Sequence, residues 1–249
     1  MKLVLGHLYA DLLNLYADRG NILTWQRRCA WRGIDLEVRE IGIGDRIPAG
    51  ELDLLFMGGG QDGDQKLMAD DLFTLKADAL RSALADGLPM LVVCGGYQLF
   101  GHYYQPAEGA RLPGLGLFDL HTVHPGAHVP RCIGNVVVEW DPSDSNRKTL
   151  VGFENHGGRT YLGSGARPLG RVLTGHGNNA KDRTEGAVVH NAYGTYLHGS
   201  LLPKNPHLAD HLLGLALARR YGAATLAPLD DSLEWRAHRA VLRRYAKAS

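Results

Sequence analysis

The amino-acid sequence predicts an α/β fold with a central, mostly parallel sheet, helices on both faces and extra antiparallel strands. In the first hundred residues, short apolar segments alternate with amphipathic segments long enough to form helices, a pattern typical of a parallel sheet covered by helices. Between about residues 117 and 197, short β-like segments follow one another with turns between them, which indicates additional strands. The chain has neither an internal repeat nor a long linker, so residues 1–249 are expected to form a single domain.

Four segments of the first half are expected to be strands of the parallel sheet, because they are short and apolar or alternate apolar with charged residues. They are residues 3–6, 34–41, 52–57 and 89–93. The alternation in the second of them is typical of an outer strand. Helices are expected between the strands, at about residues 21–32, 64–86 and 97–101. Gly33 and Gly87 follow two of these helices, where glycine commonly ends a helix.

In the second half, five short segments have β-like patterns and are expected to add antiparallel or mixed strands. They are residues 117–123, 133–140, 170–174, 186–190 and 194–197. Leucines at helical spacing predict a helix over residues 206–221. A C-terminal helix is expected at about residues 230–247, with a strongly basic polar face. That face could contact a partner, an anionic substrate or only water.

Charge and cysteine content exclude several classes of protein. The 27 Lys and Arg residues nearly balance 26 Asp and Glu residues, and no basic run occurs, which argues against a nucleic-acid partner. The three cysteines form no CxxC pair, so neither a disulfide framework nor a structural zinc site is expected. No apolar run approaches the ~20 residues that span a bilayer, so no transmembrane segment is expected. We therefore expect the protein in the reducing cytoplasm, where free thiols persist.

Cys94 is the first candidate for chemistry. It directly follows the apolar segment 90–93 and precedes Gly95, Gly96 and an expected helix. A strand–nucleophile–helix turn needs small neighbours, because the nucleophile has a strained backbone conformation. A helix N-terminus also stabilises a thiolate, and the N–H of Gly95 would be available to an oxyanion. A cysteine at the end of a strand is commonly only a small core residue, but the two glycines favour the functional interpretation.

Gly58, Gly59 and Gly60 follow the apolar segment 54–57, at the expected carboxyl end of a parallel strand. Open α/β sheets bind ligands at this edge, so backbone N–H groups of this loop are candidates for a second oxyanion donor. A simple tight turn would also explain three glycines. The GxGxxG spacing of a dinucleotide site is absent from this loop.

A catalytic cysteine needs a base, and the sequence offers 12 histidines. His198 ends a β-like segment and is followed by glycine and serine. His156 and His190 are the other strong candidates. Spacing alone does not choose between them, because a base can be distant in sequence and adjacent in space.

Several stretches together resemble class I glutamine amidotransferases. Residues 94–98 have the pattern C-x-G-x-Q of their nucleophile elbow, and the loop 58–60 matches the place of their other oxyanion element. Further stretches resemble the cobyric acid synthase-like branch, and within it the glutaminase subunits of lipid II isoglutaminyl synthases. They are LLNLYADRGN (12–21), GGGQD (58–62), GFENHGGRT (152–160), GTYLHG (194–199) and LPKNP (202–206). The resemblance implies a flavodoxin-like fold.

The resemblance also implies roles for individual residues. His198 has the place of the family's catalytic base, so Cys94 and His198 are the expected catalytic pair. The oxyanion donors would be the N–H groups of Gly95 and of Gly59 or Gly60. Arg131 and Gln98 are the candidates for binding glutamine, since an arginine suits its α-carboxylate. His156 is expected to shape a loop near the site.

Partners and cofactors follow from the same resemblance. The chain would hydrolyse L-glutamine and pass ammonia to MurT, a Mur-ligase-like subunit that forms a heterodimer with it and amidates lipid II. ATP and Mg are expected on that partner, because this chain has no G-x-x-x-x-G-K-[ST] loop and no cofactor of its own is expected. The lipid-linked acceptor would bring the complex to the inner face of the membrane.

Two departures from the broader class stand out. Val92 replaces a glycine two residues before the nucleophile, and Ser200 replaces the glutamate usually found two residues after the histidine. A carboxylate of the partner subunit is one way to orient His198 instead. Two other functions stay open: amidation in cobalamin-type biosynthesis, and a non-catalytic flavodoxin-like binding module.

Overall fold

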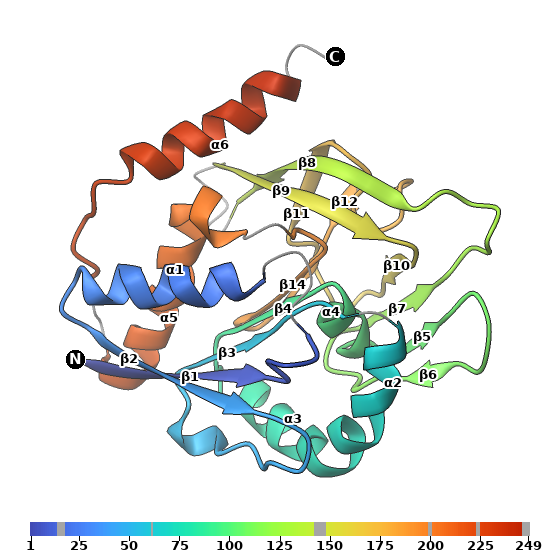
Figure 1. Cartoon of the computed structure of the whole chain (residues 1–249), viewed down its shortest axis with the longest axis horizontal. Coiled ribbons are helices and arrows are strands. Elements are labelled where there is room, and N and C mark those ends of the chain that lie inside the picture. Colours follow the sequence, from blue (N-terminus) through green and yellow to red (C-terminus); the bar gives the residue numbers. More distant parts are fainter. Residues whose placement is uncertain (14–17, 61, 142–147, 199–200, 223–224, 246–249) are drawn as a thin grey trace.

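The computed structural model describes residues 1–13, 18–60, 62–141, 148–198, 201–222 and 225–245. Its centre is a six-stranded sheet (Figure 1), in the order β13-β14-β4-β3-β1-β2. The strands are β1 (Lys2–Leu8), β2 (Asp35–Ile41), β3 (Leu54–Met57), β4 (Met90–Val93), β13 (Ala187–Val189) and β14 (Ala192–Thr195). All neighbours pair in parallel except β13 and β14. The predicted α/β fold is confirmed, and β2 lies at the edge as its alternating sequence predicted.

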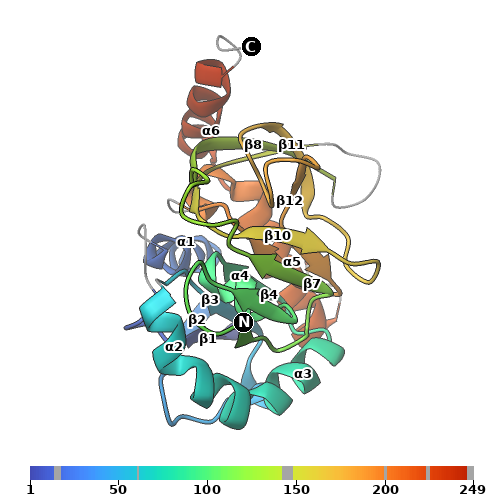
Figure 2. The ribbon, with the colours of Figure 1, turned by 90° about the vertical axis from the view of Figure 1, so that its right-hand side faces the viewer.

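Helices cover both faces of this sheet (Figures 1 and 2). On one face lie α1 (Arg19–Ala30) and α5 (Pro206–Tyr221), and α3 (Ala77–Ala85) lies on the other. The strands β3 and β4 are fully buried, which explains their continuous apolar sequence. No helix among the described residues is long and apolar enough to cross a membrane.

The single helix predicted over residues 64–86 is interrupted. It consists of α2 (Asp62–Asp71), a π-helical turn (Leu72–Lys76) and α3. Within the π-helical turn, Lys76 is completely buried, where it pairs with Asp71 and lies 5.0 Å from the ring centre of Tyr9. The ion pair joins residues only five apart, but Tyr9, from a distant part of the chain, donates to Asp71 Oδ2 (2.7 Å). Helical periodicity does not show such a tertiary contact, so it could not reveal the interruption.

Two four-stranded sheets carry the second half of the chain. Their orders are β10-β7-β5-β6 and β12-β11-β8-β9. The first contains β5 (Tyr103–Gln105), β6 (Leu112–Pro113), β7 (Leu120–Val123) and β10 (Arg159–Leu162). The second contains β8 (Cys132–Trp140), β9 (Lys148–His156), β11 (Gly170–Thr174) and β12 (Thr184–Glu185). The strands β5, β6, β9, β10 and β12 were not predicted.

The longest missed strand, β9, pairs antiparallel with β8 over nine residues. Its sequence includes Gly152 and the polar run Glu154 to His156, which hide the alternation expected of a strand. Glu154 and His156 are buried despite their polarity. Their side chains have polar partners inside the fold, so burial there does not require apolar residues.

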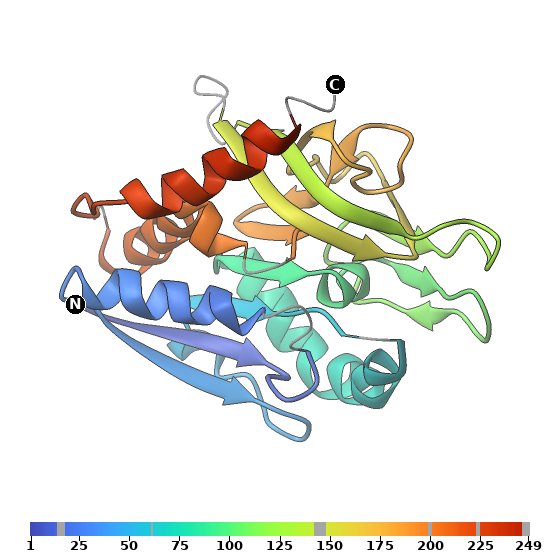
Figure 3. The same cartoon turned by 45° about the horizontal axis from the view of Figure 1, so that its top comes forward.

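The C-terminal helix α6 (Ser232–Tyr245) lies across β9 (Figure 3) and points away from the body at its end (Figures 1 and 2). A short 3-10 turn, η4 (Leu202–Lys204), and β9 are its main neighbours. Trp235 stacks on His207, with ring centres 4.9 Å apart, and the buried His238 lies beside them. The rest of the helix surface carries its arginines.

Candidate active site

Neighbouring strands of the central sheet bring the predicted site together at their carboxyl ends. In the sheet, β4 lies between β14 and β3. Cys94 directly follows β4, His198 follows β14 by three residues, and Gly58 directly follows β3. Because the three strands are parallel, their carboxyl ends meet at one edge. Residues far apart in the sequence thus become neighbours.

Cys94 has the strained backbone expected of a nucleophile elbow. Its φ is 50° and its ψ is −104°, a conformation that side-chain-bearing residues rarely adopt. Its N–H donates to Thr195 O (2.8 Å), and its carbonyl accepts from Gln98 N (2.9 Å). A Cβ on Gly96 would lie 3.0 Å from Gly58 O, so the turn requires glycine there. The strain is therefore held by bonds on both sides of the cysteine.

His198 is held by its backbone as well as by its ring. Its N–H donates to Phe153 O (2.7 Å), and Phe153 N donates to His198 O (3.2 Å). Phe153 belongs to β9, so this unpredicted strand fixes the backbone of His198. The side chain is completely buried.

Asp18 is the third side chain of the cluster, and no role was predicted for it from the sequence. Its Oδ1 lies 3.4 Å from His198 Nδ1, and both side chains are completely buried. Its Oδ2 accepts a hydrogen bond from Gly59 N (2.8 Å). The sequence left open which acid orients His198, with a carboxylate of the partner subunit as one way to supply it; a carboxylate of this chain lies there. Ser200, which has the usual place of that acid, lies outside the described residues, as do Gly199, residues 14–17, Gln61 and 246–249.

Gly59 is the point at which these three side chains meet. A Cβ built on Gly59 would lie 2.7 Å from His198 Cε1, 3.1 Å from Cys94 Cβ and 3.5 Å from Asp18 Oδ2. At these distances only the hydrogen atom of glycine fits in the place of a Cβ. The cysteine, the imidazole and the carboxylate thus surround a single glycine.

Electrostatics favour a charged imidazole at this place. Burial of the ring opposes the charged form, but the Cys94 thiolate and the Asp18 carboxylate outweigh burial and raise the pKa of His198 to about 10. The other two cysteines lack such partners, and burial raises the pKa of Cys29 to about 12 and of Cys132 to about 11. Cys94 is thus the one cysteine that faces an imidazolium.

The remaining predicted residues occupy different surroundings. Gln98 is buried and donates from Nε2 to Tyr196 Oη (3.0 Å), one helical turn after Cys94. The exposed Arg131 donates from Nε to Asn155 Oδ1 (3.0 Å) and from Nη2 to Asn155 O (3.2 Å). His156 ends β9, is buried and stacks on Tyr196 with ring centres 3.7 Å apart, and its Nδ1 donates to Gly158 O (2.8 Å) in the turn that follows β9.

The three predicted oxyanion glycines differ in what their N–H groups do. The N–H of Gly59 is directed to Asp18, which removes it as a donor to substrate in this structure. Gly95 is the first residue of α4 (Gly95–Leu99), so its N–H has no acceptor within that helix. Gly60 is buried directly beyond Gly59. Gly95 and Gly60 stay the stronger oxyanion predictions.

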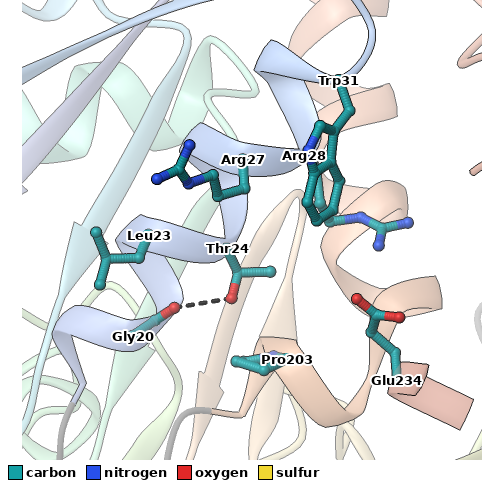
Figure 4. A pocket seen from close by; sticks show the side chains of 8 residues that line it. All are labelled: Gly20, Leu23, Thr24, Arg27, Arg28, Trp31, Pro203 and Glu234. Atoms are coloured by element: carbon teal, nitrogen blue, oxygen red, sulfur yellow. Dashed lines mark hydrogen bonds between the residues drawn. The ribbon is translucent and has the colours of Figure 1, made fainter.

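A separate cavity of about 310 Å³ opens between α1, α6 and η4 (Figure 4). Leu23 and Trp31 line it, with Arg27 and Glu234 at its sides. None of Cys94, His198 and Asp18 lines this cavity. No group of three or more metal-ligating side chains occurs in the part of the chain that the structure describes.

Comparison with known proteins identifies the family of this fold and site. A family profile described as a CobB/CobQ-like glutamine amidotransferase domain matches residues 4–206. The chain is 40% identical to the lipid II isoglutaminyl synthase (glutamine-hydrolyzing) subunit GatD of Staphylococcus aureus, over 98% of this chain and 96% of that protein. It is 38% identical to the subunit of the same name from Streptococcus pneumoniae, over 93% and 87%.

Solved structures agree on the fold. PurLQS from Thermotoga maritima superimposes with a TM-score of 0.59 at 14% identity, covering 97% of this chain and 100% of that one. A structure described as a glutamine amidotransferase superimposes with a TM-score of 0.57 at 16% identity, covering 85% of this chain and 98% of that one.

A cobyric acid synthase from Pelotomaculum thermopropionicum is 35% identical in sequence over 72% of this chain, but the match covers only 35% of its own length.

Proposed function

Because this chain belongs to the CobB/CobQ-like glutamine amidotransferase family, we propose that it hydrolyses L-glutamine at Cys94 and supplies the ammonia to a partner that amidates lipid II. The glutamine amidotransferase activity itself follows from the family and its glutamine-hydrolyzing relatives. The single observation that supports the catalytic assignment is the meeting of Cys94, His198 and Asp18 around Gly59. No other cysteine among the described residues has such neighbours.

In the proposed mechanism, the Cys94 thiolate attacks the side-chain carboxamide carbon of glutamine and forms a C–S bond. The carbonyl oxygen becomes an oxyanion. His198 then gives a proton to the nitrogen, the C–N bond breaks and ammonia leaves, which produces a glutamyl thioester. Water attacks the thioester while His198 accepts its proton, the C–S bond breaks, and glutamate and the thiolate are released. The raised pKa of His198 keeps its ring protonated, so that the ring can donate a proton to the leaving nitrogen.

Backbone N–H groups would stabilise the oxyanion. Gly95, at the start of α4, is the first donor, and Gly60 is the second. Removing one donor from such a site typically costs about 10²- to 10³-fold in rate. Gln98 and Arg131 remain the proposed contacts for the rest of the glutamine molecule, with Arg131 directed to its α-carboxylate.

The partner proposal comes from the relatives. Two proteins that match almost the whole chain are glutamine-hydrolyzing subunits of lipid II isoglutaminyl synthase. We therefore assign to this chain a Mur-ligase-like partner of the MurT type, which would bind ATP and Mg and amidate the D-glutamate of lipid II at the cytoplasmic face of the membrane. A role in cobalamin-type amidation is the weaker candidate, since the cobyric acid synthase matches over only 35% of its length.

Glutamate release from glutamine by the purified chain tests this proposal, with and without a co-expressed Mur-ligase-like partner. We expect release that depends on Cys94, is raised by the partner and is lost by at least about 10³-fold in Cys94→Ala. The matched control is Cys132→Ala, which removes a buried cysteine outside the cluster and should keep the wild-type rate. Equal activity of wild type and Cys94→Ala would reject the catalytic assignment and favour a binding module.

A further inference from the structure

We propose that Asp18 is the positioning residue of His198, so that this chain carries all three members of a cysteine–histidine–carboxylate triad. The inference rests on the proposed function of Cys94 and His198. It assigns the acid that the sequence lacks two residues after His198 to a place 180 residues earlier in the chain. The acid therefore need not come from a partner subunit.

The first observation is the contact between the two side chains. Asp18 Oδ1 lies 3.4 Å from His198 Nδ1, and neither side chain is exposed. The distance is long for a hydrogen bond, but catalytic hydrogen bonds are often long without substrate and shorten when it binds. A carboxylate at Nδ1 holds the tautomer or charged form in which Nε2 can carry the transferred proton.

The second observation is that the carboxylate is fixed in orientation. Gly59 N donates to the other oxygen, Oδ2, at 2.8 Å. This bond uses one oxygen and leaves Oδ1 directed to the imidazole. Gly59 adjoins Gly60, the proposed oxyanion donor, so the same carboxylate connects the imidazole to the loop that would bind the oxyanion.

The third observation concerns what Asp18 does not do. It stands immediately before α1, at the position where an aspartate commonly caps a helix with its side chain. In this structure Asp18 makes no side-chain capping bond. A buried carboxylate that gives up its ordinary local role and faces a buried histidine is better explained by that histidine.

The variant Asp18→Asn separates the two contacts. The amide oxygen of asparagine can still accept from Gly59 N, but its NH₂ group cannot accept a proton from His198 Nδ1. Asp53→Asn is the matched control. Asp53 is also buried and also accepts a backbone N–H, from Val4 at 2.7 Å, but it pairs with Arg220 instead of a histidine.

We expect Asp18→Asn to lower kcat for glutamine hydrolysis by about 10²- to 10⁴-fold, as loss of the triad acid does elsewhere. The KM for glutamine should change little, because Asp18 does not touch substrate. Asp53→Asn should keep its kcat per folded molecule. Asp18→Glu, which retains the charge, should recover part of the loss; no recovery, at an equal folded fraction by circular dichroism, contradicts the proposal.

The pH profile of Cys94 alkylation by iodoacetamide gives a readout that a purely structural role would not move. Loss of the carboxylate destabilises the charged form of His198, which in turn stabilises the Cys94 thiolate. The midpoint of Cys94 alkylation should therefore move to higher pH in Asp18→Asn and stay at the wild-type pH in Asp53→Asn. An unchanged midpoint and kcat in Asp18→Asn would overturn the proposal. If the wild type fails to hydrolyse glutamine, the proposed function fails, while the alkylation profile still tests the contact.

Discussion

Gly59 is the residue whose substitution the structure constrains most closely. A Cβ there would lie 2.7 Å from His198 Cε1 and 3.1 Å from Cys94 Cβ. Gly59→Ala must therefore separate the imidazole from the thiol, and we expect a loss of at least about 10²-fold in kcat, since small misplacements of reacting groups carry such costs. Gly214→Ala, in α5, is the control, because a Cβ there meets nothing within 4 Å.

The measurements are kcat for glutamine hydrolysis and the thermal melting temperature of both variants. Gly214→Ala should be fully active and slightly more stable, because alanine favours a helix over glycine by about 1 kcal/mol. A wild-type kcat in Gly59→Ala would contradict the proposed pair, because it would show that catalysis does not need the close approach of the Cys94 thiol to the His198 imidazole.

At this scale the sequence predicts some residues and not others. Cys94 and its glycines are recognisable because an elbow needs them in consecutive positions. The choice of His198 among 12 histidines needed the family resemblance. Asp18 could not be found by either route, because an aspartate before a helix has the ordinary interpretation of a cap. Only the three-dimensional contact with His198 distinguishes it.

The C-terminal helix α6 is attached to the body through histidines. His238 Nδ1 donates to Lys204 O (2.7 Å), and its Nε2 lies 2.9 Å from Thr149 Oγ1. His207 Nε2 donates to Thr149 O (3.0 Å) under the ring of Trp235. Burial, with the charges of His238 and Lys148, lowers the pKa of His207 to about 3. Burial also lowers the pKa of His238.

This attachment predicts a loss of stability in acid. A histidine whose folded pKa is lowered binds its proton first in the unfolded state, so the unfolding free energy falls as pH drops from about 6.5 toward 3. His207→Phe keeps a ring to stack on Trp235 and removes this titration. We expect the variant to lose about 2 kcal/mol less than wild type between pH 7.5 and 5.0, in urea unfolding.

Tyr193→Phe is the control, since it removes a hydroxyl that contacts a different histidine, His211. It should follow the wild-type pH dependence. A His207→Phe protein with the wild-type slope would mean that His207 does not contribute to the acid lability.

Among whole elements, those with strong periodicity or complete burial could be predicted, and the rest could not. The helix at 206–221 and the strand at 170–174 have the predicted bounds. The strand β9 was missed because its buried residues include Glu154, which bonds to the N–H groups of His176 and Gly177. Polar residues satisfied by distant partners have no local pattern.

For the whole molecule, the fold alone does not determine the activity. The two solved structures compared above match at only 14% and 16% identity, so they establish architecture. The chemistry comes from where the sheet places its loops. Four neighbouring strands, β14, β4, β3 and β1, end at one edge, and each leads to one part of the cluster: His198, Cys94, Gly59 and, through the following loop, Asp18.

The three cysteines lie in three different parts of the molecule and allow the central claim to be tested directly. Cys94 is at the sheet edge, whereas Cys29 lies in α1 and Cys132 in β8. The pKa values of Cys29 and Cys132 are raised by burial, so both should be unreactive thiols at neutral pH. A diazoketone analogue of glutamine alkylates a catalytic thiol with loss of N₂, and peptide mass spectrometry locates the label.

The most direct measurement is therefore the site of labelling in the folded protein, with and without excess glutamine. We expect one label per chain, on Cys94, with loss of glutaminase activity in proportion to labelling and protection by glutamine. Label on Cys29 or Cys132, or complete labelling of Cys94 with glutaminase activity intact, would contradict it.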